Sequence, residues 1–122
     1  MMLDNLLKID PFSIGKKEKN RIFIDQIKSL TYHHYKFCKK YKKIIKNLKL
    51  RIKNINKLEN FPMLPVRLFK NFDFKSVSER EVVKKIMSSG TSGKKLSKIY
   101  LDKKNAHNQV KVLGKIMSTI LG

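Results

Sequence analysis

The sequence predicts a mixed α/β fold, of the α+β kind within these 122 residues, with helices first and strands after them. Three observations lead to this prediction. Apolar residues recur at helical spacing through the first half, closely spaced prolines interrupt the pattern near residue 62, and short β-branched runs then flank a loop rich in serine and glycine. The hydrophobic fraction of 41% is enough to expect a folded chain despite its charge.

Residues 13–57 are expected to form a basic helical region. Ser13 suits a helix N-cap, because it follows a turn at Asp10 and Pro11. Apolar or amphipathic residues then recur at steps of three or four, which places them on one stripe of a helix or of two successive helices. His34 lies on this stripe and is therefore interpreted as a packed core histidine. The stripe consists of Ile24, Ile27, Leu30, His34, Cys38, Tyr41, Ile45, Leu48, Ile52 and Ile55.

Residues 58–80 are expected to connect the helical region to the strands. Pro62 and Pro65 each lack a backbone donor and bias the preceding residue toward extended geometry. The segment from Lys57 to Leu68 is therefore predicted to be an extended connector with apolar anchors and not a helix. The aromatic rings that follow are expected to cluster in a loop and to anchor it in the core. They belong to Phe69, Phe72 and Phe74.

Residues 81–122 are expected to form a strand, a loop, a second strand and a final helix. A short helix capped by Ser76 or Ser78 would lead into the β-branched run that ends at Met87. The second strand is predicted around Tyr100, and the helix after Asp102.

The loop Ser88–Lys98 carries the sharpest chemical signal, with two glycines, five hydroxyls and three lysines in eleven residues. Glycines let a backbone approach a ligand closely, and hydroxyls and successive amides bind phosphate oxygens. The loop is not a Walker A motif, because its glycines are only three residues apart. From composition alone, a phosphate-binding loop and a flexible linker both remain open.

The net charge of +20 combines 29 Lys and Arg residues with nine acids, and only four of the basic residues are arginines. This excess of lysine over arginine resembles the amino-acid bias of proteins from A+T-rich genomes. Proteins that recognise nucleic acid usually rely on arginine. The segment Lys36–Lys57 contains ten basic residues and no acid. It is interpreted as a solvated helix face. The alternative function is a small basic helical module that binds nucleic acid or an acidic partner.

Several classes of protein are excluded or disfavoured by composition. Cys38 is the single cysteine, so no internal disulfide framework or cysteine-based zinc site is expected. His33 and His34 lack further ligands at metal-binding spacing, so no metal site is predicted from these residues. The sequence has neither an apolar run long enough to cross a membrane nor an evident secretory signal, which leads to a cytoplasmic expectation.

Two segments at a specific spacing carry a family resemblance. Phe61–Lys70 reads FPMLPVRLFK, and Ser88–Gly93 reads SSGTSG and is followed by SKIYLD at Ser97–Asp102. Together they resemble the LuxE-like acyl-protein synthetase family of the adenylate-forming superfamily. The resemblance covers roughly Ser13 to Leu113 and includes the helical part around His33 and Cys38.

The resemblance implies an adenylate-forming α/β domain that uses ATP and Mg²⁺. Such a ligase activates a long-chain fatty acid as acyl-AMP and passes the acyl group to a protein thiol. The implied partners are a fatty acyl substrate and an acyl-accepting or reductase protein, with no specific nucleic acid. Lys98 is the preferred functional lysine, with Lys94 and Lys95 as near competitors, and no catalytic residue is named. The implied phosphate-binding residues are Ser88, Ser89, Gly90, Thr91, Ser92, Gly93, Lys94 and Lys98.

Two departures from the family pattern shape the expectations. Lys94, Lys95 and Leu96 stand where the superfamily loop continues with proline. Family members are also longer, so residues 1–122 are expected to be the N-terminal part of one domain. The adenine, ribose and metal contacts and the acceptor thiol are then expected beyond Gly122. The chain is expected to have little activity alone, and to be marginally stable or to self-associate.

Overall fold

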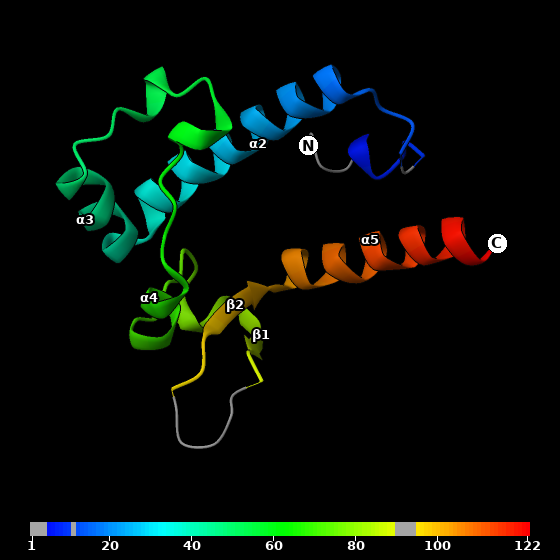
Figure 1. Cartoon of the computed structure of the whole chain (residues 1–122). Coiled ribbons are helices and arrows are strands. Elements are labelled where there is room, and N and C mark those ends of the chain that lie inside the picture. The colour runs from blue at the N-terminus through cyan, green and yellow to red at the C-terminus, as the bar shows by residue number, and fades with distance from the viewer. Residues whose placement is uncertain (1–4, 11, 90–94) are drawn as a thin grey trace.

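The computed structural model describes residues 5–10, 12–89 and 95–122 of the chain. A helical part comes first, an irregular connector follows, and a two-stranded antiparallel hairpin leads into a C-terminal helix (Figure 1). The mixed α/β prediction is confirmed at this level.

Two consecutive helices, α2 (Lys16–Phe37) and α3 (Lys39–Asn47), form most of the helical part. The predicted start at Ser13 is wrong, because Gly15 is the N-cap of α2. The Ser13 hydroxyl instead donates to the carbonyl of Asp10 at 2.7 Å and closes the preceding turn. The two helices are separated at Cys38, whose backbone is extended although neither proline nor glycine stands there.

The buried core lies mainly where α3 and the following irregular segment fold back. That segment contains the short 3₁₀ helices η1 (Ile52–Asn54) and η2 (Leu58–Asn60). The predicted stripe is confirmed only in part: Leu30 and Leu48 remain 52% and 54% exposed. The buried apolar side chains of this part are Cys38, Ile45, Ile52, Ile55 and Phe61.

The connector contains one helix that the sequence analysis excluded. Helix α4 (Val66–Asn71) starts directly after Pro65, which is its N-cap, so the prediction of an extended chain through Leu68 is wrong. Proline is compatible with this place because the first amides of a helix have no partner within the helix. The contacts of the phenylalanine cluster are confirmed, with ring centroids of Phe69 and Phe74 at 5.1 Å. The expected loop position is wrong for Phe69, which lies in α4, and Phe72 remains 47% exposed.

The hairpin consists of β1 (Val82–Met87) and β2 (Lys98–Asp102), as predicted. It is preceded by the 3₁₀ helix η3 (Glu79–Glu81), where Ser78 and Glu81 form a capping box. The final helix, α5 (Lys103–Leu121), begins where the Asp102 carboxylate accepts the backbone N–H of Asn105 at 2.8 Å.

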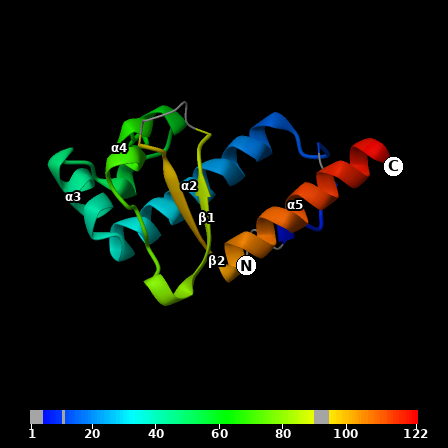
Figure 2. The ribbon, with the colours of Figure 1, turned by 90° about the horizontal axis from the view of Figure 1, so that it is seen from below.

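Helix α5 leaves the hairpin and extends along the same side of the molecule as the first half of α2 (Figures 1 and 2). Lys115 donates to the carbonyl of Leu7 at 2.8 Å and ties α5 to the N-terminal segment. Apolar side chains of α5 remain exposed, among them Val110, Leu113 and Ile120. Across the described residues, no helix is both long and apolar enough to span a bilayer.

Candidate functional site

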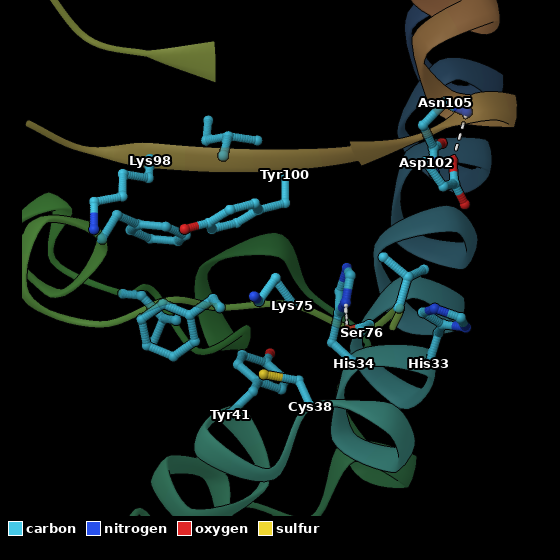
Figure 3. Close-up of a pocket in the computed structure, with 15 residues that line it drawn as sticks. His33, His34, Cys38, Tyr41, Lys75, Ser76, Lys98, Tyr100, Asp102 and Asn105 are labelled. Atoms are coloured by element: carbon cyan, nitrogen blue, oxygen red, sulfur yellow. Dashed lines mark hydrogen bonds between the residues drawn. The ribbon is translucent and has the colours of Figure 1, made fainter. Parts of the chain in front are cut away.

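A cavity of about 290 Å³ lies where the helical part, the connector and β2 meet. Helix α2 and the residue that follows it supply His33, His34 and Cys38, and β2 supplies Lys98 and Tyr100 (Figure 3). Its apolar lining is completed by Leu64, Phe69, Phe74, Val77 and Ile99. The cavity therefore combines an apolar interior with a few polar groups, as small-molecule sites do.

His34 is part of the cavity wall and contacts the connector. Its Nδ1 lies 2.6 Å from the Ser76 hydroxyl, a contact between residues that are 42 positions apart (Figure 3). The expectation that His34 is packed in the core is wrong, because the residue is exposed. His33 lines the same cavity, with its ring centroid 5.3 Å from that of His34. Cys38 is a buried free thiol nearby.

The pKa of His34 leads to a prediction about stability. Although His34 is exposed overall, desolvation of the ring at the cavity wall, followed by repulsion from His33, lowers this pKa from 6.5. His34 therefore binds its proton more tightly in the unfolded chain than in the folded chain. The free energy of unfolding is consequently highest above about pH 6.5 and declines as pH falls toward the lowered pKa of the folded state. We expect His34→Gln to flatten this decline in urea unfolding between pH 5 and 7.5. His107→Gln, on α5, is the control, and an unchanged slope in His34→Gln would contradict the assignment.

Asp73 connects the segment after α4 to β2. Its Oδ1 accepts from the Tyr100 hydroxyl at 2.7 Å and from the Lys98 amine at 3.3 Å. The bond from Tyr100, and then that from Lys98, lowers the pKa of Asp73. The hydrogen bond between Tyr100 and Asp73 also raises the pKa of Tyr100 to about 12. The amine of Lys75 lies 4.8 Å from the Tyr100 ring centroid and pairs with Glu79.

The predicted phosphate loop joins β1 to β2. Its base is closed by two bonds of 3.1 Å, from the Ser88 amide to the Ser97 carbonyl and from the Ser97 amide to the Ser88 hydroxyl oxygen. In the second bond the Ser88 hydroxyl is the acceptor, and both Ser88 and Ser89 are exposed. Lys98 is directed toward Asp73. Five predicted phosphate-binding residues lie outside the described part of the chain: Gly90, Thr91, Ser92, Gly93 and Lys94.

Sequence reasoning did not identify Asp73, Tyr100 or Lys75 as members of a site. Asp73 is 25 and 27 positions from its two partners, and no local motif marks a contact of that separation. The one available signal was the alternation of β2, which places Lys98 and Tyr100 on the same face of the strand. Ser97 was also missed, and its hydroxyl oxygen is buried without a hydrogen-bond partner among the described residues.

The described residues suit phosphate better than a metal held by protein alone. Hydroxyl and ammonium groups, the kinds present at Ser88, Ser97 and Lys98, commonly bind phosphate. Within residues 5–10, 12–89 and 95–122, no group of three or more His, Cys, Asp or Glu side chains is arranged to hold a metal ion. Mg²⁺ does not require such a group, because it commonly binds through nucleotide phosphates and one or two carboxylates.

Comparison with known proteins decides the family. The family model described as acyl-protein synthetase, LuxE, matches residues 1–122, the whole chain. The chain belongs to the LuxE family. A curated relative, the long-chain-fatty-acid–luciferin-component ligase of Photorhabdus luminescens, is 28% identical over 92 residues. The alignment covers 75% of this chain and 78% of that protein. No solved structure matches this LuxE-family chain.

Proposed function

We propose that this LuxE-family chain takes part in ATP-dependent activation of a long-chain fatty acid. The loop Ser88–Lys98 would bind the ATP phosphates, and the acyl group would pass through acyl-AMP to a protein thiol. The observation that carries the proposal is the hairpin geometry: Ser88 and Ser97 close the base of the glycine-rich loop, and Lys98 is the residue with which the loop ends and β2 begins. The family match and the name of the curated relative support the same reaction class.

The chemistry explains the need for these residue types. A carboxylate is a poor electrophile, and attachment of AMP supplies a good leaving group while pyrophosphate is released. Negative charge on the transferring phosphates must be held by fixed donors and cations. Hydroxyls at Ser88 and Ser89 would donate to phosphate oxygens, and the Lys98 amine would contribute positive charge. Mg²⁺, bound with the nucleotide, would neutralise further charge.

Two measurements test the proposed function. Isothermal titration of the chain with Mg·ATP and with tripolyphosphate tests phosphate binding, and hexadecanoate-dependent exchange of pyrophosphate into ATP tests adenylation. We expect saturable binding of both phosphate compounds that persists at physiological salt. Binding without exchange would restrict this chain to holding the nucleotide. Absence of saturable binding would contradict the phosphate-loop assignment.

The basic surface leads to a separate prediction about nucleic acid. All ten Lys and Arg side chains of the segment Lys36–Lys57 are exposed, as expected for a solvated face. We expect DNA binding to be weak and independent of sequence, and to disappear between about 50 and 200 mM salt because it would depend on counterion release. Fluorescence anisotropy with unrelated duplexes measures both properties. Tight binding of one sequence at physiological salt would favour the nucleic-acid module instead.

A further inference from the structure

One carboxylate holds two side chains of the strand that follows the loop. Lys98 and Tyr100 are two residues apart in β2, so both leave the same face of the strand. They contact the same oxygen of Asp73, the amine at 3.3 Å and the phenol at 2.7 Å. The shorter contact is a charge-assisted O–H···O⁻ bond and is the stronger of the two.

We propose that Asp73 is a positioning residue for Lys98 in the phosphate site. Tyr100 fixes the carboxylate, and the carboxylate holds the amine of Lys98, the residue with which the loop ends. The proposal depends on the proposed function, because it requires Lys98 to contact phosphate.

The arrangement leaves the lysine available to a ligand. A lysine ammonium has three N–H donors, and the contact with Asp73 uses one of them. The Lys98 side chain is 33% exposed, so a solute can reach it. A lysine stem has many rotamers, and a partner that orders it in the free protein reduces the entropy lost when phosphate binds.

Other lysines lie near the Tyr100 ring that contacts this carboxylate. The amines of Lys75 and Lys85 lie 4.8 and 5.8 Å from the Tyr100 ring centroid. Lys75 is paired with Glu79, so the cations that offset the charge of Asp73 are Lys98 and Lys40, both of which lower its pKa. Mutation can therefore distinguish a positioning role of Asp73 from simple repulsion of a bound phosphate.

The decisive experiment measures binding of Mg·ATP and of tripolyphosphate by isothermal titration at physiological salt. It compares the wild type with Asp73→Ala, Asp73→Glu, Lys98→Ala and the double variant Asp73→Ala/Lys98→Ala. We expect Asp73→Ala to weaken binding about 3- to 10-fold, the scale of ordering one long side chain. Asp73→Glu should recover part of the loss. The double variant should bind as Lys98→Ala does, because Asp73 acts only through Lys98. Circular dichroism checks that every variant remains folded.

The control Asp25→Ala removes an exposed carboxylate from α2 and should leave anion binding unchanged or slightly tighter. The proposal is overturned if Asp73→Ala binds the two phosphate compounds as tightly as this control does. It is also overturned if Asp73→Ala weakens binding by the same factor in the Lys98→Ala background as in the wild type. Failure of the proposed function gives a different result, since Lys98→Ala would then also bind like the wild type.

A spectroscopic readout tests the geometry without any ligand. The bond to Asp73 raises the pKa of Tyr100 to about 12. In Asp73→Ala the tyrosinate absorbance of Tyr100 should appear at lower pH, near the ordinary tyrosine value of about 10. Tyr100→Phe identifies the contribution of this residue. An unchanged Tyr100 titration in Asp73→Ala would show that the carboxylate does not hold β2, and would also overturn the proposal.

Discussion

Replacement of Lys98 by alanine is expected to weaken the binding of Mg·ATP by roughly 10- to 150-fold. A hydrogen bond to a charged group contributes about 1.5–3 kcal/mol, and each 1.4 kcal/mol is about a tenfold change in Kd. Isothermal titration measures the change. The control is Lys53→Ala, which removes an exposed lysine of η1 and lowers the net charge by the same amount. A similar loss in both variants would mean that only overall charge matters.

The loop glycines extend the same prediction. Gly90→Val and Gly93→Val each add a side chain where the loop backbone is proposed to approach phosphate, so both should lose Mg·ATP binding while the fold is retained. Gly114→Val is the control, because a Cβ at Gly114 in α5 meets no atom within 4 Å. Normal binding of Mg·ATP by Lys98→Ala and by both glycine variants would contradict the phosphate-loop assignment. If only Lys98→Ala binds normally, the lysine role passes to Lys94 or Lys95.

The elements nearest the proposed loop were predictable because their signals are local. The β-branched run that ends at Met87 became β1, and the caps at Ser78 and Asp102 act within three residues of their partners. Capping residues leave such signals because they satisfy amides that have no partner within the helix. The strand-like residue types around Tyr100 likewise predicted β2.

The packing of the helical part was only partly predictable. Helical periodicity identifies which residues share a face, but tertiary packing decides how much of that face is covered. The break at Cys38 has no sequence signal, and it turns α3 away from the line of α2 (Figure 1). As a result, Ile45 is buried while Leu30, on the same predicted stripe, remains exposed.

The candidate site was predicted on its loop side and missed on its connector side. Ser88 and Lys98 were predicted as phosphate-binding residues because glycine, hydroxyl and lysine are adjacent in the sequence, and that role stays a prediction. Asp73 and Ser76 reach the site only after the connector folds against β2 and α2, through contacts with Tyr100 and His34. Residue type and spacing do not specify contacts of that sequence separation.

Ile45→Ala should cause the largest loss of stability in the chain. Ile45 is 1% exposed and lies among the buried side chains of the helical part. Its truncation removes buried apolar surface and leaves a cavity, which together cost about 2–5 kcal/mol. A typical domain has only about 5–15 kcal/mol of net stability, so the midpoint of urea unfolding followed by circular dichroism should fall sharply.

Leu48→Ala is the matched control for this prediction, because Leu48 belongs to the same predicted stripe but is 54% exposed. Surface substitutions usually change stability by about 0.5 kcal/mol or less. The two variants therefore separate burial from helical spacing as the source of stability. Equal losses would mean that the stripe is covered along its whole length in solution, for example by association of α3 with another surface. A large loss in Ile45→Ala alone would show that the core lies where α3 folds back toward Ile52 and Phe61.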